Sequence, residues 1–203
     1  MKTPRTRIQK KNTEAILEAA LDVFSAEGFK GATLDKIAKR AELSKPNLLY
    51  YFPSKEAIYV ALLGHLMDTW MDPLKEMRDG GDPVEEIVAY VLRKLEMSRK
   101  FPRESRLFAN EIVRGAPHIR DMIDGPLSEL MAEKAALIRG WVKAGQIADV
   151  DGYHLIFSIW ATTQHYADFD VQVRGLLRPK GDAHFSDAAK FLEGFYRRAL
   201  RPN

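Results

Sequence analysis

The 203-residue chain contains no cysteine, which excludes a disulfide framework and any thiolate metal site. No uninterrupted apolar stretch approaches the ~20 residues that a membrane-spanning helix needs. The five histidines lack the spacing of paired zinc ligands, and the sequence has neither a Gly-x-Ser-x-Gly elbow nor a glycine-rich phosphate loop. These absences argue against an enzyme and against a metal or other cofactor. We expect a cytoplasmic protein without a membrane segment.

Charge is unevenly distributed along the chain. Residues 1–55 hold 11 lysines and arginines against 6 aspartates and glutamates, a net charge of +5, whereas the remaining residues hold 20 against 22, a net charge of −2. A basic N-terminal part on a near-neutral body is typical of a protein that binds a polyanion such as DNA. A solvated basic tail would have the same charge, so charge alone leaves both interpretations open.

Apolar residues recur at helical spacing along nearly the whole chain, and no segment shows the alternation of a strand. We therefore predict an all-α protein of about nine helices. Gly28 is expected to stop the first helix. The predicted helix starts are at Thr33, Ser44, Ser54, Asp82 and Asp151. Two long helices are predicted, at about 119–144, with Pro126 kinking its start, and at about 152–173.

Residues 33–55 read as two short helices joined by a tight turn and followed by a longer helix, the pattern of a helix-turn-helix unit. Lys45 and Asn47 lie at the start of the second short helix, where lysine can reach guanine acceptors and asparagine can bind adenine. Tyrosine and lysine side chains and a capped helix N-terminus can bind the phosphate groups of the DNA backbone. The predicted DNA-binding residues are Thr33, Lys45, Pro46, Asn47, Tyr50, Tyr51 and Lys55. We assign 1–55 to a DNA-binding domain and 56–203 to a helical ligand-binding and dimerisation domain.

The spacing of Thr33, Ile37-Ala38, Ser44, Leu49-Tyr50, Phe52, Lys55 and Ala57 resembles that of the TetR family of bacterial transcriptional regulators. Four stretches resemble the pyrimidine-utilisation (Rut) regulator subgroup more specifically: 47–57, 105–108, 137–143 and 155–169. The resemblance implies a homodimeric repressor that responds to uracil or thymine. Glu42 departs from the family pattern, which more often has glycine in this turn, and is expected to change the turn slightly.

Three residues of the C-terminal part are predicted to bind a flat ligand: Trp70, Trp160 and Gln164. Trp160 and Gln164 are one helical turn apart on the same face. An indole can stack on a pyrimidine ring, and an amide can donate and accept hydrogen bonds along its edge. Phe108 and Thr163 are predicted to complete the walls. A tryptophan on an apolar stripe is by itself more often a core residue than a ligand contact.

Two helices, at about 152–173 and 185–200, carry enough apolar residues to pack as a four-helix bundle across a two-fold axis. In such a homodimer the two reading helices would lie about 34–36 Å apart and would read a near-palindromic operator. Two alternatives remain open. One is a TetR-type regulator of an unrelated flat hydrophobic ligand, and the other is a helical protein-interaction module that does not bind DNA.

Overall fold

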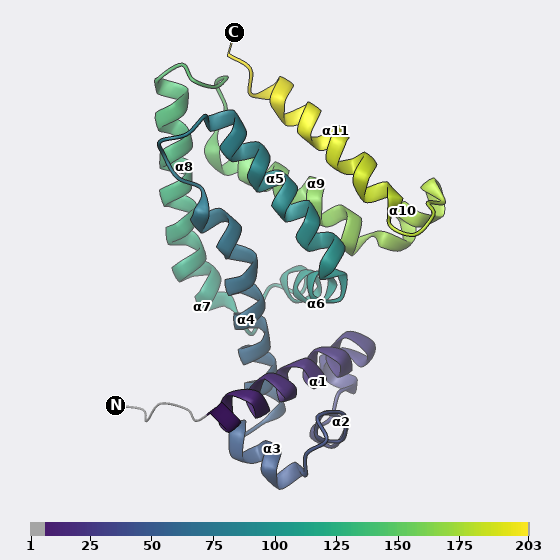
Figure 1. Cartoon of the computed structure of the whole chain (residues 1–203). Coiled ribbons are helices and arrows are strands. Elements are labelled where there is room, and N and C mark those ends of the chain that lie inside the picture. The colour runs from purple at the N-terminus through teal and green to yellow at the C-terminus, as the bar shows by residue number, and fades with distance from the viewer. Residues whose placement is uncertain (1–6, 203) are drawn as a thin grey trace. The chain divides into compact units, whose positions relative to one another are not determined.

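The computed structural model describes residues 7–202, and all regular elements among them are helical (Figure 1). The N-terminal helices are α1 (Arg7–Gly31), α2 (Leu34–Arg40), α3 (Lys45–Tyr51) and α4 (Lys55–Glu76). The middle of the chain forms α5 (Pro83–Lys100), α6 (Pro102–Val113), α7 (Arg120–Met122), the π-helical turn η1 (Ile123–Leu127) and α8 (Ser128–Lys143). The C-terminal helices are α9 (Gly152–Asp168), α10 (Asp170–Leu177) and α11 (Ala183–Ala199). The predicted all-α class is confirmed.

The predicted helix signals act as expected. Gly28 leaves the helical conformation with φ 69°, near the end of α1. Thr33 caps α2 by accepting a hydrogen bond from the Lys36 amide, and Asp82 caps α5 by accepting from the amides of Val84 and Glu85. Ser44, Ser54 and Asp151 cap the starts of α3, α4 and α9 in the same way. These caps satisfy amides that have no partner inside their helices.

Both long helices predicted in the C-terminal part are divided. Pro126 lies inside η1, so the predicted helix at 119–144 becomes α7, η1 and α8. A proline has no amide hydrogen to donate, and a widened turn accommodates it. The predicted helix at 152–173 ends at Asp168, and α10 follows after Phe169, whose φ of −113° interrupts the helix. The interruption places Asp168 at the end of α9, which matters for the site below.

The chain divides into two compact units. The head unit comprises Met1–Met67 with Leu107–Ile119, and the body unit comprises Asp68–Arg106 with Arg120–Asn203. Two helices, α4 and α6, are therefore each shared between the units. This division differs from the predicted functional boundary at residue 55, which stays a prediction.

The head unit is built from α1, α2 and α3, which pack in sequence, and from the first part of α4. Ile16, Phe24, Ile37, Leu48 and Ile58 form its buried core. A second group of contacts is polar. The carboxylate of Glu111 is buried and accepts hydrogen bonds from the His118 amide at 2.8 Å and from the Tyr59 hydroxyl at 3.3 Å. Burial, reinforced by the Glu111 charge, raises the pKa of Tyr59 to about 12.

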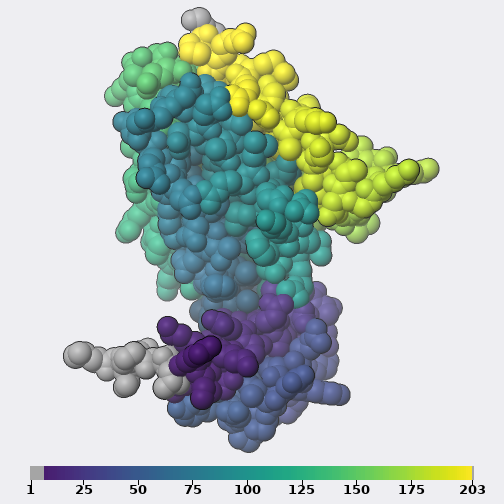
Figure 2. Space-filling view, in the orientation of Figure 1, coloured from purple at the N-terminus to yellow at the C-terminus, as the bar shows by residue number. Residues whose placement is uncertain are grey.

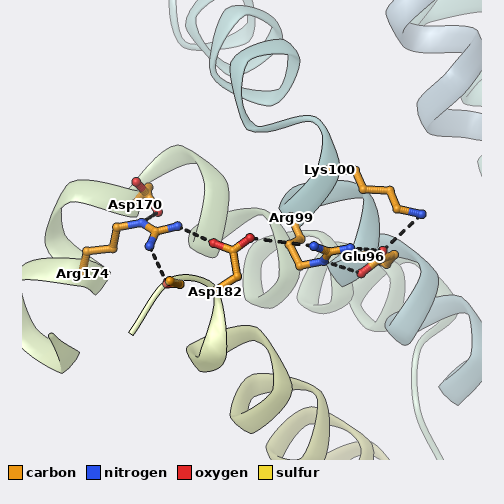
Figure 3. Close-up of polar contacts among 7 residues, drawn as sticks. Glu96, Arg99, Lys100, Asp170, Arg174 and Asp182 are labelled. Carbon is orange, nitrogen blue, oxygen red and sulfur yellow. Dashed lines mark hydrogen bonds and ion pairs between the residues drawn. The ribbon is translucent and has the colours of Figure 1, made fainter. Parts of the chain in front are cut away.

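In the body unit, α5 packs against both α9 and α11, and α8 packs against α9 (Figure 1). The core of this unit includes Val91, Ile138, Ile156, Ile159 and Tyr196. Ion pairs connect the end of α5 to α10 and to the start of α11 (Figure 3). They join Glu96, Arg99, Lys100, Asp170, Arg174 and Asp182. Exposed pairs contribute little individually, and the pair of Asp170 with Arg174 lies immediately after Asp168 in the chain.

Candidate functional sites

The DNA-reading segment has the predicted helix-turn-helix form. Its turn contains Glu42 with φ 56°, the left-handed conformation that glycine adopts without strain. The Leu43 amide then donates to the Ala38 carbonyl at 2.9 Å, which closes the end of α2. The departure at Glu42 therefore leaves the turn intact and adds local strain. Leu48 is fully buried on the inner side of α3.

The other side of α3 is available for contact. Lys45, Pro46, Asn47 and Tyr50 are exposed, and Tyr50 retains 72% of its accessible surface. Pro46 lies in the first turn of α3, as predicted. The Lys45 ammonium lies 2.9 Å from the Asp35 carboxylate in an exposed ion pair, which a phosphate or a base can replace at small cost. The base-reading roles of Lys45 and Asn47 stay predictions.

Three of the predicted phosphate contacts have partners inside the head unit. The Tyr50 hydroxyl accepts a long hydrogen bond of 3.4 Å from the Gln9 amide group. The Tyr51 hydroxyl accepts from the Asn12 amide group at 2.8 Å. The Lys55 ammonium donates to the carbonyls of Phe29 at 2.7 Å and Ala32 at 2.9 Å, so it caps the end of α1. Lys55 therefore has a structural role that the sequence did not indicate, and its phosphate contact stays a prediction. Thr33 is exposed at the start of α2.

The body unit aligns polar and aromatic residues on two facing helices. Trp160, Gln164 and Asp168 follow one another at intervals of four residues along α9, and Tyr90 and Lys94 do the same on α5. At one end of this row, the Trp160 Nε1–H donates to the Tyr90 hydroxyl at 2.6 Å. At the other end, Lys94 and Asp168 interact electrostatically. Gln164 lies between these two ends on α9, and its half-buried amide has no hydrogen-bond partner among the described residues.

Helices α4 and α6 each place a side chain against this row of polar and aromatic residues on α5 and α9. The Lys94 ammonium lies 4.3 Å from the ring centroid of Trp70, which projects from the second half of α4. Ser105 of α6 donates its hydroxyl hydrogen to Asp168 at 2.6 Å. Burial of Lys94 lowers its pKa to about 7, although the Asp168 charge opposes this shift. Burial raises the pKa of Asp168, and the Ser105 hydrogen bond opposes that shift.

Three of the five predicted ligand residues, Trp70, Trp160 and Gln164, thus belong to this row or contact it. Thr163 is fully buried, and its hydroxyl donates to the Ile159 carbonyl at 2.7 Å. Phe108 is half-buried and belongs to the head unit. The ligand roles of all five stay predictions. Within residues 7–202 no cluster of three or more acidic or histidine side chains is placed to hold a metal ion.

Sequence reasoning missed Tyr90, Lys94, Ser105 and Asp168. The sequence analysis did not single out Tyr90 or Lys94, and both are about 2% exposed. The available signal was their position: Lys94 lies between Val91 and Leu95 on the apolar side of α5. A lysine on such a side is buried only rarely, and only with a specific reason.

Exposed aromatic residues lie on the outer sides of α9 and α11. Phe157, Phe191 and Phe195 retain 48%, 61% and 43% of their accessible surface. In Figure 2, α11 (yellow) forms the edge of the body unit and its outer surface is uncovered. Ile156, Ile159 and Tyr196 of the same two helices are instead buried in the core. Within the described residues, none of the helices has both the length and the apolar character required to cross a membrane.

Known proteins match the chain over nearly its whole length. Residues 16–62 match the family described as bacterial regulatory proteins, tetR family, and residues 63–203 match the YcdC-like protein, C-terminal region. The chain is 46% identical over 200 residues to the HTH-type transcriptional regulator RutR of Escherichia coli K12, covering 98% of this chain and 94% of that protein. It is 28% identical over 154 residues to the transcriptional repressor NicS of Pseudomonas putida, covering 72% of this chain and 70% of that protein.

Solved structures agree on the fold. The complex of AibR with isovaleryl coenzyme A and operator DNA has a TM-score of 0.71 at 20% identity, covering 95% of this chain and all of that chain. A fatty acid metabolism regulator of Clostridium perfringens has a TM-score of 0.70 at 20% identity, covering 93% of this chain and all of that chain. The chain belongs to the TetR family, and is a dimeric, ligand-responsive regulator of transcription that binds operator DNA and is not an enzyme.

Proposed function

We propose that the protein is a repressor that occupies a near-palindromic operator and leaves it when uracil or thymine binds in the body unit. The observation that carries the ligand assignment is the row of Trp160, Gln164 and Asp168 on α9, with the Gln164 amide, which lacks a hydrogen-bond partner within residues 7–202, at its centre. The chain's likeness to the Rut regulator subgroup supports a pyrimidine, since those stretches include 155–169. As a DNA-binding regulator, it would act in the cytoplasm.

Each part of the row suits a pyrimidine. A pyrimidine has a flat ring, which the indoles of Trp70 and Trp160 can contact, and an edge of alternating N–H and C=O groups. The Gln164 amide can both donate to and accept from that edge, which removes the cost of an unpaired polar group. An unrelated flat hydrophobic ligand would use the indoles but would leave Gln164 unpaired, and is therefore the less favoured alternative.

Transmission to DNA would follow the shared helices. Helix α4 carries Trp70 in the body unit and begins in the head unit, where Lys55 caps α1. A ligand that displaces Trp70 therefore acts on a helix that also belongs to the DNA-reading unit. The ligand can shift the protein between DNA-competent and DNA-incompetent states only by the difference in its affinity for the two.

Dimerisation would use the outer sides of α9 and α11, where Phe157, Phe191 and Phe195 are exposed. Apolar helix faces of two copies can pack across a two-fold axis as a four-helix bundle. The two copies of α3 would then meet the major groove about one helical turn, roughly 34–36 Å, apart.

The test is a pair of variants measured for both DNA and uracil. Operator duplexes are first selected from a random pool by the wild-type protein. Gln164→Leu should retain operator binding and lose its release by uracil. Lys45→Ala should weaken operator binding and leave uracil affinity unchanged. The proposal is wrong if neither uracil nor thymine changes tryptophan fluorescence or operator occupancy of the folded wild-type protein.

A further inference from the structure

Two buried lysines of the body unit have contrasting surroundings. Lys134 of α8 is 5% exposed, and its ammonium donates to the carbonyls of Met77 at 2.8 Å and Lys75 at 3.3 Å. Lys94 of α5 is 2% exposed, but its ammonium has no hydrogen-bond acceptor among the described residues. Among the described residues, the fully buried side-chain polar atoms without a partner are the two ring nitrogens of His184, so the Lys94 ammonium is not completely enclosed and keeps some accessible surface for a ligand atom. A strongly perturbed charged group in such a position is typical of a functional site.

The environment of Lys94 has an apolar side and an acidic side. The Trp70 ring lies 4.3 Å from its ammonium and provides a cation–π contact. Asp168 acts on Lys94 through its charge, yet no ion pair within 4.0 Å joins them among the described residues. The Asp168 carboxylate is oriented by Ser105, which donates to one of its oxygens, Oδ1, at 2.6 Å. The second oxygen, Oδ2, has no donor among the described residues.

The Lys94 ammonium is therefore a hydrogen-bond donor and the Asp168 carboxylate an acceptor of opposite charge, and the two groups interact electrostatically without forming an ion pair among the described residues. We propose that Lys94 and Asp168 read the –CO–NH– edge of a neutral cyclic lactam, with the Lys94 ammonium donating to the carbonyl and Asp168 accepting from the N–H. This inference rests on the proposed function and names the chemistry that the site recognises. The Trp70 ring would then contact the face of the ligand, and Gln164, one turn before Asp168, would meet the next polar atom of its edge.

Charge favours a neutral ligand over a charged one. The Lys94 ammonium and the Asp168 carboxylate balance each other, so a neutral lactam adds no uncompensated charge to a buried site. Both hydrogen bonds would involve an ionised partner, and such bonds are shorter and stronger than neutral ones. An anion would meet Asp168 and a cation would meet Lys94, and each would be excluded by the group of like charge.

The state of Lys94 makes recognition dependent on pH. Only the ammonium form has the positive charge, and burial lowers the pKa of Lys94 to about 7. Asp168 is the acidic group that acts on Lys94, while Arg106 and His165 act on Asp168. A lactam that accepts from the ammonium binds the protonated form more tightly. Its affinity therefore falls as pH rises above about 7.

The experiment measures binding by calorimetry of the full-length protein with four probes: uracil, 1,3-dimethyluracil, hydantoin and glutarimide. Dimethyluracil keeps the flat ring and both carbonyls but has no N–H. Lys94→Met and Asp168→Asn should each weaken uracil binding by about tenfold to a hundredfold, the usual loss for a hydrogen bond to a charged group. Lys134→Met is the matched control, because it removes a buried lysine that already has acceptors, and its uracil affinity should stay within about twofold of wild type.

The outcomes separate this inference from the proposed function. If uracil binds and Lys94→Met or Asp168→Asn binds it as tightly as wild type, the lactam reading is wrong and the pyrimidine proposal stands. If hydantoin or glutarimide binds and uracil and thymine do not, the lactam reading stands and the pyrimidine proposal fails. Binding of dimethyluracil equal to that of uracil overturns the role of Asp168. A wild-type affinity that does not fall between pH 7 and 8.5, where Lys94→Met should be flat, overturns the role of Lys94.

Discussion

Replacing Lys94 with methionine should make the ligand-free protein more stable. Methionine keeps most of the side-chain volume and removes the charge of a side chain that is 2% exposed and whose ammonium has no hydrogen-bond acceptor among the described residues. The folded protein lowers the pKa of Lys94 from 10.5 to about 7. A shift of one unit corresponds to about 1.36 kcal/mol, so holding the charged form inside the fold costs up to about 5 kcal/mol. The cation–π contact with Trp70 is lost in the variant and offsets part of this gain.

The stability difference between Lys94→Met and wild type depends on pH. Because the folded-state pKa of Lys94 is depressed, the unfolded chain binds more protons than the folded one between about pH 7 and pH 10.5. Wild-type stability therefore gains from Lys94 as pH rises through that window. The advantage of Lys94→Met should be largest at or below pH 7 and should shrink toward pH 10.

The free energy of unfolding of wild type and of Lys94→Met is measured by urea unfolding at pH 6.5 and at pH 9.5. The protein concentration is held fixed, because the apparent stability of a dimer depends on it. Lys94→Met should exceed wild type by about 1–4 kcal/mol at pH 6.5, as replaced buried charges often do. The control Lys134→Met should lose about 1–3 kcal/mol at both pH values, since two carbonyls lose their donor. If Lys94→Met is the less stable protein at pH 6.5, the reasoning about its unpaired ammonium is refuted.

Two further substitutions test the head unit. Glu42→Gly should raise the free energy of unfolding by about 1 kcal/mol, because glycine adopts the positive φ of this turn without strain; urea unfolding that shows a loss would contradict the strained-turn interpretation. Glu111→Ala should lower the free energy of unfolding by about 1–3 kcal/mol, because Tyr59 and the His118 amide lose their acceptor. In a spectroscopic titration of the same variant, the Tyr59 pKa should fall from about 12 and stay above 10, since burial remains its largest cause. An unchanged Tyr59 pKa would show that the Glu111 charge does not act on it.

The helix starts and stops were predictable because each depends on a few neighbouring residues. A cap such as Asp82 before Pro83, or a stop such as Gly28, acts within one turn and is visible in sequence. The helix-turn-helix was predictable for the same reason. The interruption at Phe169 was not, because nothing in the local sequence marks it.

The contacts of the candidate site were harder to predict because they join distant segments. Trp160 and Gln164 could be paired from their spacing on one helix. Lys94 could not be matched with Trp70 or Asp168, since they lie on three different helices. Lys55 shows the same limit: its charge suggests a phosphate contact, whereas in the fold its ammonium donates to the carbonyls of Phe29 and Ala32 at the end of α1.

The most direct test of the account is the coupling between uracil and the operator. Fluorescence anisotropy of a labelled operator duplex is measured with and without saturating uracil, at fixed salt because DNA affinity depends strongly on it. The account predicts that uracil weakens operator binding at least about fivefold, and that the operator weakens uracil binding by the same factor. Operator affinity that is unchanged when tryptophan fluorescence reports full uracil occupancy would contradict the central claim.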